Sequence, residues 1–62
     1  MIEFVECDGT YRGVDARRRL WRITPVVAGW RLEYRVSGER TSWGAGVFGD
    51  LVAAQREADR EY

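Results

Sequence analysis

The chain contains no histidine, no lysine and no asparagine among its 62 residues. Histidine is the side chain that most often serves as a general base and as a metal ligand, so its absence removes the commonest route to both kinds of site. The acidic residues are scattered among arginines with no spacing typical of metal ligands, which favours paired or solvated charges. We therefore expect a protein that is not an enzyme, with no catalytic residue, no cofactor and no metal.

Cysteine and long apolar runs are also scarce. Cys7 is the single cysteine, so the chain cannot form an internal disulfide, and the disulfide framework of a secreted mini-protein is excluded. With no histidine to activate it, we expect Cys7 to serve core packing rather than nucleophilic chemistry. No apolar run approaches the ~20 residues that span a bilayer, and no signal-peptide segment follows Met1. We expect a cytoplasmic protein with no membrane partner.

The small size of the chain limits its hydrophobic core. Residues 1–62 are expected to form one domain, and a chain of this length buries only ~60% of the surface that its unfolded form exposes. Trp21, Trp30 and Trp43 compensate, because each aromatic side chain contributes a large buried area. Self-association is another common remedy for a small core. A protein partner or a homo-oligomer, most simply a homodimer, is therefore expected.

Charge is balanced in total and uneven along the chain. Ten arginines match ten acidic residues. Residues 1–15 hold four acids and one arginine, residues 16–40 hold seven arginines and two acids, and residues 41–62 hold two arginines and four acids. Such asymmetry marks either a partner-binding surface or a solvated face. The use of arginine to the exclusion of lysine favours a GC-rich genome as the source.

Hydrophobic periodicity predicts two central strands. In residues 30–36, apolar and aromatic residues alternate strictly with Arg31, Glu33 and Arg35, which is typical of a half-buried antiparallel strand. Residues 20–27 form a second strand, with Trp21, Ile23 and Val27 on one face. Pro25 cannot donate to a strand ladder, so this strand is expected at an edge or with a bulge. Residues 28–29 supply the turn between the two strands.

Weaker patterns predict the remaining strands. Residues 2–7 read as a strand, the dipeptide Asp8-Gly9 as a hairpin turn, and residues 10–14 as a short returning strand. Residues 15–19 are expected to form a loop or a single helical turn. Residues 37–40 form the next turn, and residues 41–48 form a strand in which Trp43, Ala45 and Val47 face the same way.

The pattern changes to a helical period near the C-terminus. Leu51, Ala54, Ala58 and Tyr62 recur at helical spacing over residues 50–62, and Gly49 or Asp50 is placed to cap the helix. The apolar stripe is narrow and made of small residues, so the helix should lie close to the sheet. The predicted class is α+β: a small antiparallel meander sheet of three to five strands, with one C-terminal helix packed on a face.

The stretch GAGVFG at residues 44–49 matches the dinucleotide fingerprint G-x-G-x-x-G. That fingerprint requires a helix, a second parallel strand and an acidic residue ~20 residues further on. Only thirteen residues follow Gly49, which leaves room for the helix alone. We therefore expect no nucleotide and no small-molecule substrate. Gly44 and Gly46 instead predict a bulge, a strong twist or the close approach of another backbone, so replacing either with valine should disturb folding or association.

The arginines form the candidate functional face. The candidate interface or nucleic-acid residues are Arg17, Arg18, Arg19, Arg22, Arg31, Arg35 and Arg40. Their guanidinium groups are suited to phosphates. They are more typical of a solvated loop and polar sheet face, with Glu33 and Glu39 as cross-strand partners. Arginine and aromatic residues are also enriched at protein interfaces, and a helix lined with alanine offers too little cover for five large aromatics.

Residues 20–62 resemble the small β-β-β-α modules of phage and actinobacterial proteins. The resemblance rests on G-W-R-L-E-Y, on V-F-G-D-L and on the A-A-x-x-x-A helix. The same pattern of residues is similar to the arm-type DNA-binding domains of tyrosine integrases. In those domains the polar face of the sheet enters the major groove, and the resemblance implies that Arg22, Arg31, Arg35 and Arg40 would read DNA. The chain departs from the pattern in Glu33 and in its zero net charge.

Two functional hypotheses follow. The first is a non-enzymatic small interaction or regulatory protein, of phage or mobile-element origin, that binds another protein or itself. The alternative is a sheet-based DNA-binding accessory protein that uses its arginine-rich face.

Overall fold

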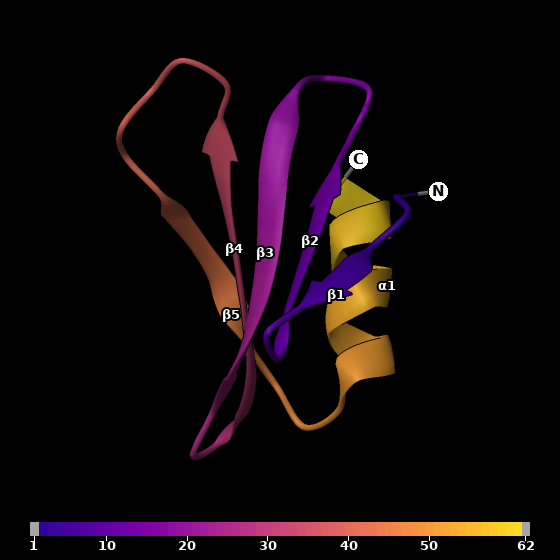
Figure 1. Ribbon diagram of the computed structural model, residues 1–62. Helices are drawn as coiled ribbons and strands as arrows, with labels where there is room; N and C mark the ends of the chain where they lie inside the picture. The colour runs from indigo at the N-terminus through magenta and orange to yellow at the C-terminus, as the bar shows by residue number, and fades with distance from the viewer. Residues whose placement is uncertain (1, 62) are drawn as a thin grey trace.

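The computed structural model describes residues 2–61, and the predicted helical position of Tyr62 lies outside them. Five strands and one helix follow in order: β1 (Val5–Cys7), β2 (Thr10–Val14), β3 (Arg19–Val26), β4 (Gly29–Val36), β5 (Trp43–Phe48) and α1 (Leu51–Glu61) (Figure 1). The strands pair in that same order as one antiparallel sheet. This architecture confirms the predicted α+β class, with a meander sheet and a C-terminal helix. No helix of the described residues has the length and apolarity to cross a membrane.

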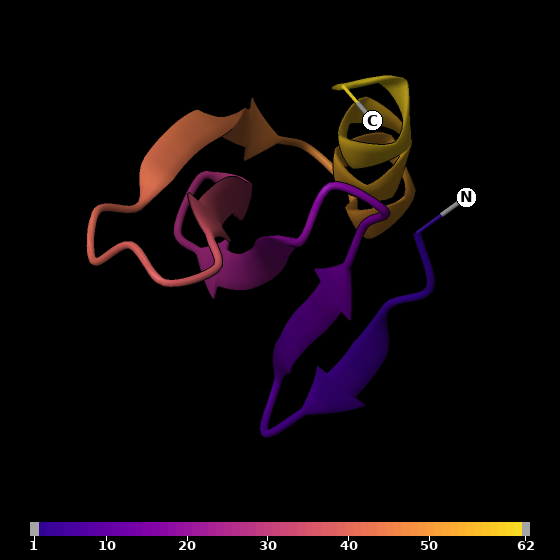
Figure 2. The ribbon, with the colours of Figure 1, turned by 90° about the horizontal axis from the view of Figure 1, so that it is seen from above.

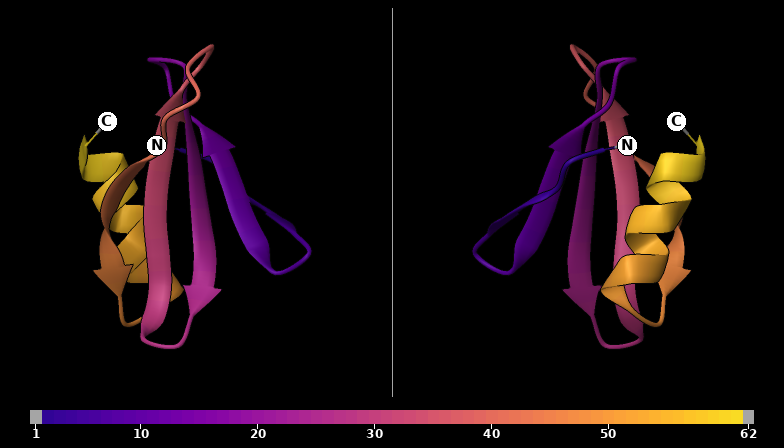
Figure 3. Two further views of the ribbon diagram at one scale, coloured as in Figure 1. Left: turned by 90° about the vertical axis from the view of Figure 1, so that its left-hand side faces the viewer. Right: turned by 90° about the vertical axis from the view of Figure 1, so that its right-hand side faces the viewer.

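The pair β3–β4 forms the middle of the molecule. Trp21 lies opposite Tyr34 and Ile23 opposite Leu32, whereas Arg22 lies opposite Glu33 on the other face. Because side chains alternate along a strand, the apolar set faces one side and the charged set the other. The helix α1 lies against the apolar side alone, as the two side views show (Figure 3). The strict alternation predicted for residues 30–36 is confirmed.

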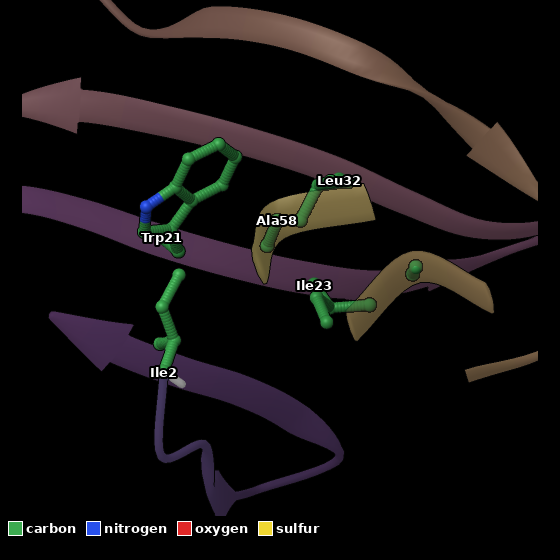
Figure 4. Close-up of a cluster of buried hydrophobic side chains, with 6 residues drawn as sticks. Ile2, Trp21, Ile23, Leu32 and Ala58 are labelled. Atoms are coloured by element: carbon green, nitrogen blue, oxygen red, sulfur yellow. The ribbon is translucent and has the colours of Figure 1, made fainter. Parts of the chain in front are cut away.

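The hydrophobic core is small and lies between this apolar side and α1. Its buried members are Ile2, Trp21, Ile23, Leu32, Ala54 and Ala58. The close-up shows Ala58, on its turn of α1, close to Leu32 (Figure 4). Alanine has no side chain beyond Cβ, so the helix backbone comes close to the sheet. The narrow stripe of Leu51, Ala54 and Ala58 therefore packs as predicted.

Both ends of α1 are tied by carboxylates. The Ala53 N–H donates to Asp50 Oδ1 over 2.7 Å, which is the N-cap bond that a helix start needs. Asp50 is thus the capping residue. Near the other end, Asp59 Oδ1 accepts a hydrogen bond from the Ile2 N–H over 2.6 Å. That bond and the burial of Ile2 attach the N-terminal segment to the helix, so strand β1 begins at Val5 and not at residue 2.

The first hairpin has the predicted turn. Asp8 and Gly9 have φ angles of 52° and 83°, and two positive φ values are what the tightest two-residue hairpin turn requires. The second hairpin turns one residue earlier than predicted, at Val27 and Ala28, so Val27 is fully exposed and does not face the core. Gly29 opens β4 instead, and a Cβ there would overlap the Phe48 carbonyl oxygen.

Pro25 lies in a central strand, so the prediction of an edge strand is wrong for β3 as a whole. The pairing of β2 with β3 nevertheless stops at Ile23, whereas β4 pairs as far as Val26. The last three residues of β3 therefore have a neighbour on one side only. A proline is tolerated there because it lacks the donor that a strand with two neighbours would use.

A bulge interrupts β5. Leu32 pairs with Gly46 and Glu33 pairs with Gly44, which leaves Ala45 as an extra residue. The predicted bulge is confirmed, and it overturns the prediction that Trp43, Ala45 and Val47 share a face. Trp43 lies opposite Tyr34 and Val47 opposite Arg31, on the two different faces of the sheet.

The two glycines of the bulge differ in their tolerance of a side chain. Gly46 has a φ of 126°, a conformation that L side chains rarely adopt, whereas Gly44 has no positive φ and open space around its Cβ position. We predict that Gly46→Val lowers the free energy of unfolding by roughly 1–3 kcal/mol. Gly44→Val should change it by less than about 0.5 kcal/mol, which corrects the expectation that both would disturb folding. Urea unfolding followed by tryptophan fluorescence measures both, and equal losses would contradict the assignment of the bulge.

Candidate functional site

The side of the sheet away from α1, here called the open face, carries arginines in rows across the strands. One row runs from Arg12 on β2 through Arg22 on β3 to Glu33 on β4. The next row runs from Val14 through Leu20 to Arg35. Arg31 pairs with Thr24 in a third row. The alternation of β3 and β4 therefore brings together Arg22, Arg31 and Arg35 as the sequence predicts, and it adds Arg12.

The open face is concave. The hairpin of β1 and β2 turns away from β3 and β4 on the side opposite α1 (Figure 2 and Figure 3). The groove that results has a volume of about 670 Å³. Its lining comprises Glu3, Val5, Arg12, Gly13, Val14, Leu20, Trp21, Arg22, Glu33, Tyr34, Arg35 and Ser42. Four strands and the loop before β5 thus contribute to one surface.

Charges in the groove are only partly neutralised. Arg22 Nη2 lies 3.1 Å from Glu33 Oε1, so the two central charges satisfy each other. Among the described residues no ion pair joins Arg12, Arg31 or Arg35, and all three are exposed. Glu3 is the other acidic residue of the groove lining. The open face therefore has an excess of positive charge that is available to a ligand.

Apolar side chains lie beside these arginines. Val5 is 64% exposed and Val14 59% exposed, and Leu20 is half-buried between them and Arg35. On the other side of the sheet, Trp43 of the edge strand β5 is 52% exposed. Trp21, in contrast, is fully buried. The predicted excess of aromatics over helical cover is thus relieved by burying one indole completely and leaving another half in water.

Three of the candidate arginines lie in loops. Arg17 and Arg18 belong to the turn between β2 and β3, and Arg40 belongs to the loop between β4 and β5. These connections lie at the same end of the sheet (Figure 1), and the Ser37 N–H donates to the Arg18 carbonyl oxygen over 3.1 Å. The three arginines therefore lie at one end of the open face, close to Arg35, rather than on its strands.

Arg19 does not belong to the open face. It precedes Leu20, so alternation turns it to the side of Trp21 and α1. Its Nε lies 2.6 Å from Asp15 Oδ2, and its guanidinium carbon lies 5.1 Å from the centre of the Trp21 ring. The grouping of Arg19 with the other candidate residues is corrected: Arg19 is part of the internal packing.

Asp15 organises the turn that carries these residues. Its buried carboxylate accepts hydrogen bonds from the Arg17 N–H, the Arg19 N–H, the Arg19 Nε–H and the Trp21 indole N–H, at 2.6–2.9 Å. Burial raises the pKa of Asp15, but the hydrogen bonds from Trp21, Arg19 and Arg17 together lower that pKa by more, so it lies below its ordinary value.

The sequence prediction of the site omits Arg12 and Asp15, and the prediction for Cys7 is wrong. Arg12 was detectable, because Thr10, Arg12 and Val14 share one face of a short strand. Asp15 was detectable as the start of an Asx-type turn with an arginine four residues on. Cys7 was expected in the core, but it is exposed at the end of the edge strand β1, which the helix does not reach. No group of three metal-ligating side chains occurs in residues 2–61.

Comparison with known proteins finds no matching family model, no matching curated protein and no matching solved structure. The resemblance to integrase arm-type domains therefore stays a prediction. What the chain does has to be argued from the open face itself.

We predict that Asp15→Asn lowers the free energy of unfolding by about 1–3 kcal/mol at neutral pH, because an amide cannot accept all four hydrogen bonds. The pKa of Asp15 is lower in the folded than in the unfolded protein. Its stabilising contribution is therefore complete above the unfolded pKa of about 3.9 and is lost as pH falls through the lower folded pKa. Urea unfolding between about pH 7 and pH 2 measures this. A parallel pH dependence in wild type and Asp15→Asn would contradict it.

Proposed function

We propose that this protein is a non-enzymatic interaction protein that binds another protein through its open face. The observation that carries the proposal is the composition of that face. Arg12 and Arg35 are exposed, have no ion pair among the described residues, and line the groove together with the exposed Val5 and Val14. The open face thus combines charged groups, which would orient a partner, with apolar area, which would contribute to affinity.

A purely solvated face accounts less well for this surface. On a face that only meets water, arginines gain little from being brought together, and like charges in adjacent rows repel one another. Contact between water and the exposed valines on two neighbouring strands is also unfavourable, and a partner that covered these valines would remove that contact. Arginine surrounded by apolar area is the composition found at the centres of protein interfaces.

The size of the molecule fits the same function. A protein interface of ordinary size covers about 800 Å² on each partner. The accessible surface of this protein is 4434 Å², so one such interface would take about a fifth of it. A sheet covered by a helix on one side has one broad face left, and here that face is concave. A second copy of the chain is included among the partners, because self-association is a common remedy for a small core.

DNA binding is the second candidate function. The observation in its favour is that Arg22 neutralises Glu33, whose charge would otherwise oppose phosphates in the middle of the face. A titration of labelled duplex DNA separates the two candidates. Contacts to phosphates would give micromolar affinity that falls steeply with salt. No binding at low salt would remove this candidate.

We predict that the double variant Val5→Ser, Val14→Ser loses at least 90% of the partner protein that immobilised wild type retains from a bacterial lysate, because the partner covers these side chains. The matched control is Val27→Ser, Val52→Ser, which changes two valines outside the open face that are 110% and 54% exposed. The control should retain as much partner as wild type.

Two results would contradict the proposal. One is equal loss of the retained protein in both double variants. The other is the absence of any protein whose retention depends on Val5 and Val14. Urea unfolding of both variants shows that the fold is kept, and sedimentation of the purified protein identifies a second copy if that is the partner.

A further inference from the structure

We infer that the open face binds an extended acidic segment of the partner, in which two carboxylates lie four residues apart with an apolar residue midway between them. The inference rests on the proposed function and names the chemistry of the partner. It depends on the positions of Arg12 and Arg35 on either side of strand β3.

The register sets the separation of these two arginines. Arg12 lies on β2 opposite Arg22, and Arg35 lies on β4 opposite Leu20, so they are two strands and one row apart. Neighbouring strands are about 4.8 Å apart, and residues on the same face of a strand recur about every 6.7 Å. These spacings place the two Cα atoms about 12 Å apart in a flat sheet.

An extended peptide matches this separation. It rises about 3.3 Å per residue, so residues i and i+4 are about 13 Å apart. Alternate side chains point to the same side, and residue i+2 therefore faces the sheet together with i and i+4. The line from Arg12 to Arg35 crosses β3 between Arg22 and Leu20, and Val14 is the neighbour of Leu20 in its row. An apolar residue at i+2 would cover this part of the groove.

Charge complementarity selects an acidic ligand with few charges. Arg22 and Glu33 neutralise each other over 3.1 Å, whereas Arg12 and Arg35 are exposed and have no ion pair within residues 2–61. Two carboxylates would therefore satisfy the two available guanidinium groups. Glu3 in the groove lining opposes further negative charge.

A nucleic acid strand fits this groove less well than a peptide does. It carries a negative charge at every nucleotide, so some phosphates would fall near Glu3 and Glu33. Bases bind to single-strand sites by stacking on aromatic rings. Trp21 and Tyr34 belong to the groove lining, but strand alternation turns their side chains to the side of α1, where their ring centres lie 4.9 Å apart. The exposed apolar side chains of the lining are those of Val5 and Val14.

The test uses a fluorescein-labelled heptapeptide of threonines, with glutamate at its second and sixth positions and leucine at its fourth. Fluorescence anisotropy should show binding that weakens as salt is raised. Arg12→Gln with Arg35→Gln should weaken binding five- to tenfold, because two exposed ion pairs are lost. Arg56→Gln with Arg60→Gln removes the same charge from exposed positions on α1, on the other side of the sheet, and should leave the affinity unchanged.

Two further probes test the spacing and the charge. The first has its glutamates at the third and fifth positions, and the second has glutamine in place of glutamate. Both should bind at least fivefold more weakly than the original peptide. Equal binding of the two spacings would overturn the inference, and so would equal effects of the two arginine double variants.

The remaining outcomes separate this inference from the proposed function. If the peptide does not bind but a partner is retained through Val5 and Val14, the acidic-segment inference fails and the proposed function stands. Tighter binding of a labelled DNA duplex than of the peptide, lost in Arg12→Gln with Arg35→Gln, would overturn the inference in favour of nucleic acid. Salt-sensitive self-association that requires the same two arginines, and that the peptide does not inhibit, would overturn it in favour of a second copy.

Discussion

The contact of Ala54 and Ala58 with the apolar side of β3 and β4 is the interaction on which the rest of the structure depends. A chain of 62 residues has room for one such layer. Because the two alanines are small, the helix lies close to Ile23 and Leu32 and excludes water from both. The same contact decides which side of the sheet is left uncovered.

The adjacent residues Arg19 and Leu20 illustrate this dependence. Strand alternation sends Arg19 to the covered side, where the Asp15 carboxylate and the Trp21 ring hold its guanidinium group. Leu20 is sent to the open face, where it lies between arginines. A charged residue is thus internal and an apolar residue is partly exposed. The buried ion pair is stabilised by hydrogen bonds from the Trp21 indole and from backbone N–H groups, and a carboxylate at this depth would be unfavourable without them.

The open face combines features that reinforce one another in binding. The bend of the β1–β2 hairpin makes it concave, and the Arg22–Glu33 pair neutralises its centre. Arg12 and Arg35, which form no ion pair with the part of the chain that the structure describes, lie on either side of that centre. A zero net charge for the whole chain is compatible with this local excess, because the groove lining contains only two of the ten acidic residues, Glu3 and Glu33. Local arrangement, rather than total charge, is what a partner would recognise.

The sequence by itself determined the parts of the fold that depend on local pattern. The alternation of residues 30–36, the turn at Asp8-Gly9 and the helical spacing of Leu51, Ala54 and Ala58 each encode an element within a few residues of chain. Alternation also determined that Arg22, Arg31 and Arg35 share a face. These predictions hold because backbone geometry fixes side-chain direction at short range.

Only the tertiary structure decided the rest, because the decisive contacts join residues far apart in sequence. The bulge at Ala45 depends on how β5 pairs with β4, and it moved Val47 to the opposite face from Trp43. The burial of Asp15 depends on the indole of Trp21. The addition of Arg12 to the site depends on the register of β2 against β3. Periodicity reports which side chains share a side of a strand, but only packing decides which side is covered.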